Sequence, residues 1–347
     1  MPINVLIVDD SATARAVLTD ILKSDPEIGT VDTAPDAYVA RDKIVNNRPD
    51  VICLDVEMPR MDGITFLRKL MQHVPVPVVM VSSLTQKGAK TTLDALDAGA
   101  IDFVPKPHSN IYEGSEDIRK DLLEKVKTAS RAQVIKHKAS KGGAPLEYKG
   151  ALSETTQKIV AIGASTGGTE ALKDVLSKLP RNSPGIIVVQ HMPANFTAQF
   201  AQRLDSICEV EVKEAKNGDT VGIGQVLLAP GDLHMVLRRS GHRYYVQLGS
   251  GDKVSGHRPS VDVLFNSVSK AAGSNAVGVI LTGMGADGAK GMLNMKKAGA
   301  KTIGQDKISC VVYGMPKVAF ELGGVDKQFP LDKIPKAILD LIGEEER

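Results

Sequence analysis

The chain has 347 residues, of which 42% are apolar and 24% are charged, and its formal net charge is +2. These values are typical of a globular protein of about two domains. They exclude the basic footprint of a nucleic-acid-binding protein, and no apolar run reaches the roughly 18 residues that a membrane-spanning helix needs.

The first segment, "MPINVLIVDD", lacks the basic start and the cleavage site of a signal peptide. The three cysteines, Cys53, Cys208 and Cys310, are too scattered for a disulfide framework or a metal motif. We therefore expect a cytoplasmic protein with no membrane insertion.

Apolar runs alternate with helical patterns in the first third of the chain. We expect strands at 3–10, 50–59, 76–83 and 101–107, and helices at 11–25, 63–73 and 89–100. Strands that are apolar throughout and separated by single helices indicate a parallel sheet covered on both faces. In such sheets the ligand site lies beyond the C-terminal ends of the strands.

Polar side chains fall at these strand ends. Asp9 and Asp10 end the first of these strands and Asp55 lies in the second, while Ser82 and Lys106 lie at the ends of the last two. Carboxylates gathered in this way suit Mg²⁺, and a carboxylate beside a divalent ion, a hydroxyl and an ammonium group is a plausible phosphoryl acceptor. Any one of these acids alone is better explained as a loop residue, but the set together is not.

The motifs "LIVDDS", "DVICLDVEMPRMDG", "MVSS" and "DFVPKP" occur in the order seen in two-component receiver domains, which residues 1 to about 125 resemble. The resemblance implies a flavodoxin-like five-stranded sheet and phosphorylation of Asp55. It implies Asp9, Asp10 and Asp55 as Mg²⁺ ligands. It also implies Ser82 as the switch hydroxyl, Phe103 as the switch aromatic residue and Lys106 as the lysine of the site.

Residues 113–133 begin as an amphipathic helix, after which the chain gathers Lys, Ser, Gly and Pro. This composition is typical of a linker. We place a receiver domain at 1–128, a linker at 129–156 and a second domain at 157–347. The cluster Lys136, His137, Lys138 and Lys141 is either a solvated part of this connector, which base rates favour, or an interaction patch.

The second half repeats the alternation. We expect strands at 158–165, 185–193, 225–232 and 276–288, helices at 169–180, 195–207, 260–273 and 288–300, and a hairpin at 234–248. This pattern predicts a second α/β domain with a mainly parallel sheet and a β-hairpin insertion.

The stretch "GASTGG" at 163–168 has two interpretations. A dinucleotide-binding loop needs a different glycine spacing and an acid after the second strand, and a P-loop needs Gly-Lys-Ser/Thr, so phosphate binding is weakly supported. The alternative is G-x-S-x-G, a strand-to-helix turn that exposes Ser165 as a nucleophile. His191 at the end of the next strand would be its base, and Asp287 the acid that orients the base.

The order of these residues along the chain, Ser, His, Asp, differs from that of the α/β-hydrolases. A triad that uses Asp219 or Asp232 with His242 or His257 would restore the hydrolase order, and we rank it second because those residues lie in or beside the hairpin. Other interpretations stay open. His234 is either a structural histidine or a substrate contact. His257 and Arg258 precede a helix, and whether they line the cleft is the second open point.

Residues 157–347 resemble the catalytic domain of the chemotaxis protein-glutamate methylesterases, the CheB family. The motifs that carry the resemblance are "GASTGGTEAL", "VVQHMP", "LAPGDLHM", "GHRPSVDVLF", "GVILTGMGADGAKGM" and "SCVVYGMP". The resemblance implies Ser165 as nucleophile, His191 as base, Asp287 as orienting acid, and the backbone N–H of Met284 in the oxyanion hole. The N–H of Thr166, next to the nucleophile, is a further candidate donor.

Together the two resemblances imply a phosphorylation-activated hydrolase that removes methyl esters from chemoreceptor glutamates, releases methanol and deamidates receptor glutamines. Its partners would be methyl-accepting receptors and a chemotaxis histidine kinase, with Mg²⁺ for phosphorylation and no cofactor for the esterase step. Two rival functions are a signalling adaptor without chemistry and a transcriptional regulator, and the chain shows no helix-turn-helix pattern that would support the latter.

Overall fold

The computed structural model describes residues 2–82, 85–106, 115–132, 146 and 158–343. The chain divides into two compact units, Met1–Lys138 and Ala139–Arg347. The cluster Lys136, His137, Lys138 and Lys141, and all but a few residues of the expected linker, lie outside the described residues.

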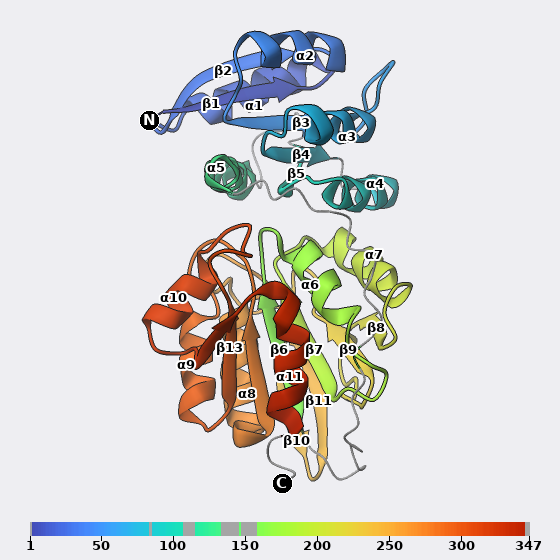
Figure 1. Cartoon of the computed structure of the whole chain (residues 1–347), viewed down its shortest axis with the longest axis vertical. Coiled ribbons are helices and arrows are strands. Elements are labelled where there is room, and N and C mark those ends of the chain that lie inside the picture. The colour runs from blue at the N-terminus through green and yellow to red at the C-terminus, as the bar shows by residue number, and fades with distance from the viewer. Residues whose placement is uncertain (1, 83–84, 107–114, 133–145, 147–157, 344–347) are drawn as a thin grey trace. The chain divides into compact units, whose positions relative to one another are not determined.

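The first unit is built on a five-stranded parallel sheet with the order β2-β1-β3-β4-β5. Its strands are β1 (Ile3–Val8), β2 (Ile28–Ala34), β3 (Val51–Asp55), β4 (Val78–Ser82) and β5 (Asp102–Pro105). Its helices are α1 (Ala12–Lys23), α2 (Ala37–Asn46), α3 (Gly63–His73), α4 (Gln86–Asp97) and α5 (Ser115–Arg131). Helices α1 and α5 pack together on one face, and α3 and α4 on the other (Figure 1).

Four of these helices begin at a residue whose side chain accepts a hydrogen bond from the backbone of the first turn. The capping residues are Ser11, Asp36, Asp62 and Thr85. Such caps satisfy N–H groups that have no partner inside the helix. They fix where each helix starts, and hence the length of each loop at the C-terminal edge of the sheet.

The second unit has a seven-stranded sheet with the order β14-β13-β12-β6-β7-β9-β8, and every pair in it is parallel. The strands are β6 (Ile159–Ala164), β7 (Gly185–Gln190), β8 (Glu211–Glu214), β9 (Gln225–Leu228), β12 (Ala276–Ile280), β13 (Lys301–Gln305) and β14 (Lys327–Phe329). All residues of β6, β7 and β12 are buried, as expected for central strands covered on both faces.

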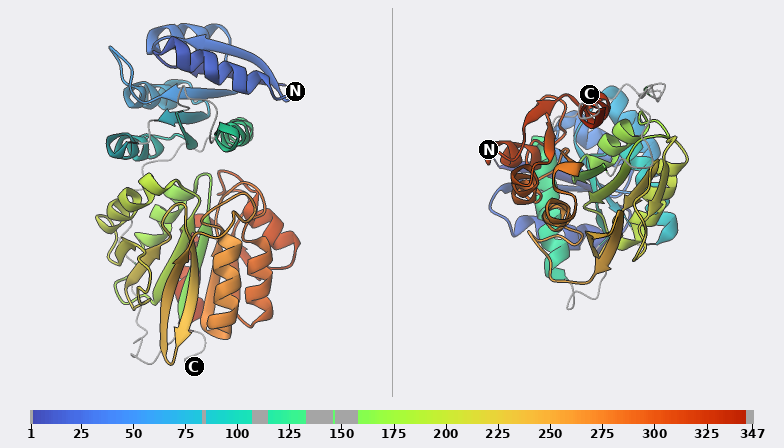
Figure 2. Two further views of the ribbon diagram at one scale, coloured as in Figure 1. Left: turned by 180° about the vertical axis from the view of Figure 1, so that it is seen from behind. Right: turned by 90° about the horizontal axis from the view of Figure 1, so that it is seen from below.

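Helices cover both faces of this second sheet. They are α6 (Gly168–Leu176), α7 (Ala194–Asp205), α8 (Val261–Ala271), α9 (Ala289–Lys297), α10 (Met315–Glu321) and α11 (Ile334–Gly343). Helix α11 packs on α6 over one face (Figure 1), and α8 lies on the opposite face, where it contacts α9. The hairpin of β10 (His234–Ser240) and β11 (Arg243–Gly249) packs against α8 (Figure 2).

The predicted fold class is confirmed, with a parallel five-stranded unit, a second parallel α/β unit and the hairpin. Two details differ from the expectation. Strand β12 ends at Ile280, so Asp287 lies in the loop after the strand and not at its end. The pattern of apolar residues also failed to reveal the strands β2, β8, β13 and β14 and the helices α2, α10 and α11. Among the described residues, no helix is both long and apolar enough to cross a bilayer.

Candidate functional site

Ser165 lies in a sharp turn between β6 and α6. Its backbone N–H donates to Thr282 O at 3.0 Å, and its carbonyl accepts from Gly168 N at 2.6 Å. Gly167 adopts a left-handed φ of 75°, which a glycine tolerates without strain. The turn thus holds the serine beside the N-terminus of α6, where backbone N–H groups and the helix dipole favour negative charge.

His191 directly follows β7, the strand that pairs with β6. Its N–H donates to Ala164 O at 3.1 Å, which ties it to the end of the neighbouring strand. The side chain of Gln190 reinforces this link, because its Nε2 donates to the carbonyls of Ser165 and His191 at 3.0 and 3.1 Å. The two strand ends therefore place the imidazole against the serine, and His191 Nδ1 lies 3.1 Å from Ser165 Oγ.

Asp287 contacts the other edge of the same imidazole. Its Oδ2 atom lies 2.9 Å from His191 Nε2, although the two residues are 96 positions apart. The aspartate comes from the loop after β12, the strand that pairs with β6 on the side opposite β7. The three residues thus follow three adjacent strands, and β6, which precedes the serine, is the middle strand.

The carboxylate of Asp287 is buried, with an exposed fraction of 1%, and sits at the N-terminus of α8. It accepts hydrogen bonds from Ser260 Oγ at 2.8 Å, Val261 N at 2.7 Å and Asp262 N at 3.1 Å. Burial alone would raise the pKa of Asp287, but the hydrogen bonds from His191, Ser260 and Asp262 outweigh it and hold the pKa below its usual range. The acid is therefore charged and fixed in orientation.

The loop after β12 also passes very close to Ser165. A Cβ on Gly283 would lie 2.8 Å from Ser165 Cβ and 2.3 Å from Met315 Sδ, which no side chain could occupy. Gly283 is held on its other side, since its N–H donates to Val312 O at 3.1 Å and its carbonyl accepts from Met315 N at 2.8 Å. Gly283 therefore lies against Ser165, and the next backbone N–H along this loop is that of Met284.

Serine, imidazole and carboxylate in hydrogen-bonding sequence form an arrangement that can activate a hydroxyl for acyl transfer. The alternative triad is not assembled. Asp219 pairs with Lys213 Nζ at 3.1 Å and accepts from Lys216 N, and Asp232 pairs with Arg258. Neither carboxylate has a histidine among its partners in the described residues.

The other histidines of interest have clear positions. His234 is buried, accepts from Ser260 N at 3.3 Å through Nδ1 and donates to Asp252 O at 2.8 Å through Nε2, as a structural histidine does. The ring of His257 stacks on that of His191. Arg258 is bound to Asp232 and so braces the loops beside the site.

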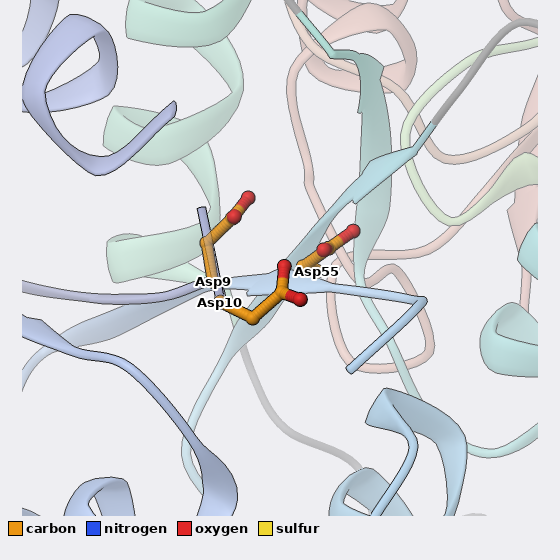
Figure 3. Close-up of side chains that lie close together, drawn as sticks. All are labelled: Asp9, Asp10 and Asp55. Carbon is orange, nitrogen blue, oxygen red and sulfur yellow. The ribbon is translucent and has the colours of Figure 1, made fainter. Parts of the chain in front are cut away.

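A second cluster lies at the C-terminal edge of the first unit's sheet. Carboxylate oxygens of Asp9, Asp10 and Asp55 lie within 4.8 Å of one another (Figure 3). Lys106 Nζ lies 2.8 Å from Asp9 Oδ2 and 2.9 Å from Asp55 Oδ2. A cavity of about 280 Å³ adjoins them and is lined by Asp10, Asp55, Val56, Glu57, Ser82, Gly88 and Lys106.

The electrostatics of this cluster fit a bound cation. Burial, followed by the charge of Asp9, raises the pKa of Asp55, although Lys106 opposes both effects. Three carboxylates around one position repel each other unless a positive charge lies between them. Mg²⁺ prefers hard oxygen ligands and open space for bound water. Asp9, Asp10 and Asp55 are thus suited to hold Mg²⁺.

Two further expected residues lie near this cluster or behind it. Ser82 ends β4, lines the cavity, and has its Oγ 2.6 Å from Thr92 Oγ1 of α4. Phe103 is buried in β5, with Lys125 Nζ 5.3 Å from the centre of its ring. Its carbonyl accepts from the same ammonium at 2.7 Å.

Sequence reasoning missed residues that support the two sites, one in each unit and one against His191. Ser260 and Thr92 were not singled out, and the stacking of His257 on His191 was not foreseen. The signal for Ser260 was local, because a serine before an apolar helical pattern is a typical N-cap. Its contact with Asp287, 27 positions away, depends on the packing of α8 against the loop after β12.

Comparisons with known proteins identify the family of the chain. The family model described as CheB methylesterase matches residues 160–338, and that of the response regulator receiver domain matches residues 5–112. A protein-glutamate methylesterase/protein-glutamine glutaminase of Sulfurimonas denitrificans is 61% identical over 99% of both chains. One of Syntrophus aciditrophicus is 56% identical over 98% of this chain and 99% of its own.

Among solved structures, the crystal structure of the Thermotoga maritima CheB methylesterase catalytic domain is 44% identical, with a TM-score of 0.52. It covers 53% of this chain and 98% of its own. The chain therefore belongs to the CheB methylesterase family and carries a response regulator receiver domain in its N-terminal part.

Proposed function

We propose that this protein hydrolyses glutamate methyl esters on chemoreceptors, with release of methanol, and deamidates receptor glutamines. The observation that carries the proposal is the position of His191, whose ring nitrogens lie 3.1 Å from Ser165 Oγ and 2.9 Å from Asp287 Oδ2. The names of the relatives, protein-glutamate methylesterase/protein-glutamine glutaminase, support the choice of substrate.

In the proposed reaction His191 takes the proton of Ser165 as Oγ attacks the ester carbonyl. The tetrahedral oxyanion receives hydrogen bonds from the backbone N–H groups of Met284 and Thr166. His191 returns the proton to the leaving methoxide, and methanol departs. A water molecule, deprotonated by the same imidazole, then hydrolyses the acyl-enzyme.

Asp287 keeps His191 in one tautomer and stabilises the imidazolium that forms in each half-reaction. With a glutamine side chain the steps are the same, but His191 protonates the leaving ammonia. Both substrates therefore need one set of residues, because both reactions pass through the same kind of tetrahedral intermediate.

We assign residues 1–128 to the receiver domain, 129–156 to a linker and 157–347 to the catalytic domain. In the receiver, Asp55 accepts a phosphoryl group from a chemotaxis histidine kinase. Mg²⁺ held by Asp9, Asp10 and Asp55 would neutralise charge on the transferring group. Lys106 contributes a fixed positive charge, since hydrogen bonds from its ammonium group to Asp9 and Asp55 raise its pKa in spite of burial.

Phosphorylation of Asp55 would then control the catalytic domain. Ser82 and Phe103 would respond to the phosphoryl group and favour a receiver state that restrains the catalytic domain less. Under this proposal, a chain that lacks the receiver is more active than the unphosphorylated whole protein. Equal or lower activity of the truncated chain would contradict it.

The decisive experiment measures methanol release from methylated receptor membranes, for the wild type and Ser165→Ala, with and without a small-molecule phosphodonor and Mg²⁺. We expect release to require Ser165 and to increase with the phosphodonor. Full activity of Ser165→Ala would refute the catalytic assignment. Receptor binding without methanol release by the wild type would support an adaptor in its place.

A further inference from the structure

The ring of His257 lies flat against the ring of His191. The two ring centres are 3.7 Å apart, and the ring planes differ by 13°. His257 comes from the segment between the hairpin and α8, so nothing in the local sequence brings the two side chains together. The contact is a product of the fold, and it involves the residue that links Ser165 to Asp287.

A short turn fixes the backbone of His257. Val254 and His257 exchange both backbone hydrogen bonds, at 3.1 and 3.0 Å. The two residues between them, Ser255 and Gly256, have φ values of 53° and 82°. Positive φ at both central positions is typical of the tight two-residue turns that join hairpin strands. The backbone that carries the imidazole is thus tied back on itself.

Arg258 fastens the same segment to the loops around the site. Its Nε and one terminal nitrogen donate to Asp232 Oδ1 at 3.0 and 2.6 Å, and the other terminal nitrogen donates to Gly251 O at 2.9 Å. Its own carbonyl accepts from Asp232 N at 3.1 Å. Two residues later, Ser260 donates to Asp287. The segment 257–260 therefore contacts the base at one end and the acid at the other.

The two hydrogen bonds of His191 fix the edges of its ring but leave its faces unconstrained. The ring can still move along the normal to its own plane, and such a displacement takes Nδ1 out of line with the Ser165 hydroxyl. A flat ring stacked on one face opposes displacement toward that face. It also helps to exclude water, and the exposed fraction of the His191 side chain is only 7%.

We propose that His257 is a positioning residue for the proposed catalytic base: its ring holds the imidazole of His191 in the plane that reaches both Ser165 and Asp287. The stack also offers the face of an aromatic ring to the imidazolium that forms during catalysis, a favourable arrangement for a cation. The receptor substrate used in the test rests on the proposed function, whereas the contact between the two rings does not.

The test compares His257→Ala, His257→Leu and His257→Phe with the wild type in the full chain. His242→Ala is the matched control, because His242 lies in the exposed turn of the hairpin. The first readout is the rate at which a serine-directed phosphonate labels Ser165, which requires an activated serine but no receptor. The second is the kcat and KM of methanol release from methylated receptor membranes.

We expect His257→Ala and His257→Leu to lower the labelling rate and kcat by about tenfold, with KM little changed, because small errors in the placement of a catalytic group are costly. His257→Phe restores a flat ring and should recover most of the rate, while His242→Ala stays at the wild-type level. Thermal unfolding of each variant separates this effect from loss of the fold.

Three outcomes would overturn the proposal. One is an unchanged rate for His257→Ala. Another is equal recovery by leucine and phenylalanine, which would mean that bulk alone is needed. The third is equal loss for alanine and phenylalanine, which would mean that the imidazole itself acts chemically. If wild-type labelling is fast but no methanol is released, the substrate assignment fails and the labelling rates still test the stack.

Discussion

Asp287 approaches His191 at Nε2, at a distance of 2.9 Å, so that Nδ1 is the nitrogen that faces Ser165. In the common Ser-His-Asp arrangement the two ring nitrogens have the opposite assignment. A carboxylate can only accept, so the neutral ring carries its proton on Nε2 and offers the Nδ1 lone pair to the serine. The chemistry is unchanged, because either nitrogen of imidazole can act as the base.

Replacement of Asp287 by asparagine tests the role of the acid. The carboxylate accepts from four donors, and an amide would turn its NH₂ group toward at least one backbone N–H of α8. We expect kcat to fall by about 10³- to 10⁴-fold because the tautomer of His191 is no longer fixed. Methanol release and phosphonate labelling should fall together. A loss below tenfold would argue against Asp287 as the orienting residue.

Acid should weaken the contribution of Asp287 to stability. Its folded-state pKa is depressed below the usual 3.8, so the stabilisation is complete above that value and disappears as the pH falls through the depressed pKa. Asparagine does not titrate. The difference in unfolding free energy between the wild type and Asp287→Asn should therefore be constant near neutrality and shrink below about pH 4. Denaturant unfolding at several pH values measures it, and a difference that grows in acid would contradict the assignment.

Ser260 should matter for both stability and rate. Its hydroxyl donates to Asp287 Oδ1 and also caps α8 by accepting from Val263 N at 3.3 Å. We expect Ser260→Ala to lose about 1–2 kcal/mol of unfolding free energy and to lower kcat several-fold. Ser260→Thr keeps the hydroxyl and should recover part of both.

Ser269→Ala is the matched control for Ser260, because this hydroxyl lies in the same helix and donates to Asn266 O at 2.9 Å. Chemical denaturation and methanol release provide the two measurements. If Ser260→Ala behaves like Ser269→Ala in both, the serine does not support the acid.

Gly283 should not tolerate a side chain. The added Cβ in Gly283→Ala would overlap Met315 Sδ and the backbone and Cβ of Ser165. We expect a loss of about 1–3 kcal/mol in stability and at least a 100-fold loss in kcat, because the nucleophile must move relative to its base. Gly249→Ala is the control, since its Cβ would meet no atom within 4 Å. Full activity of Gly283→Ala would show that the close approach is not needed.

Thr92 should restrain the receiver switch. Its hydroxyl lies 2.7 Å from Gly88 O and 2.6 Å from Ser82 Oγ. The Gly88 carbonyl can only accept a hydrogen bond, so Thr92 uses its single hydroxyl proton for that contact. The contact between Thr92 and Ser82 is then a hydrogen bond when Ser82 is the donor. A phosphoryl group on Asp55 must therefore compete with Thr92 for the Ser82 proton.

Thr92→Val removes this competition and should lower the phosphodonor concentration for half-maximal activation by roughly fivefold, the equivalent of one neutral hydrogen bond. The measurement is methanol release against phosphodonor concentration, with Thr91→Val as the control in the same helix. An unchanged or higher half-maximal concentration for Thr92→Val would refute the competition.

The sequence predicted the central strands well because they are buried on both faces and therefore apolar throughout. Strand β2, with the sequence IGTVDTA, lies at the sheet edge and is partly exposed, so its polar residues hide the pattern. Strand β14 has only three residues, too few for any period. Apolar patterning detects burial, and edge strands have less of it.

The residues of the candidate site also differ in how far the sequence predicted their positions. Ser165 and His191 directly follow adjacent central strands, so the order of the motifs was enough to bring them together. Asp287 was identified by its motif, but its actual position depends on the loop after β12 and on the N-terminus of α8. The stack of His257 on His191 could not be predicted, since it requires the hairpin and its following turn to be packed in three dimensions.

Strand β6 lies between β7 and β12, so the arrangement of Ser165, His191 and Asp287 depends on which strands are neighbours and not on their order along the chain. The proposed reaction needs three neighbouring strands that present His191, Ser165 and Asp287 close together. The order in which the backbone passes through those strands does not matter. A circularly permuted protein with new termini in the exposed turn at Gly241 would read Asp, Ser, His along its polypeptide and keep the same constellation. The order of the motifs along the chain thus reflects the evolutionary history of the protein, whereas the proposed reaction depends on which strands are adjacent in the sheet.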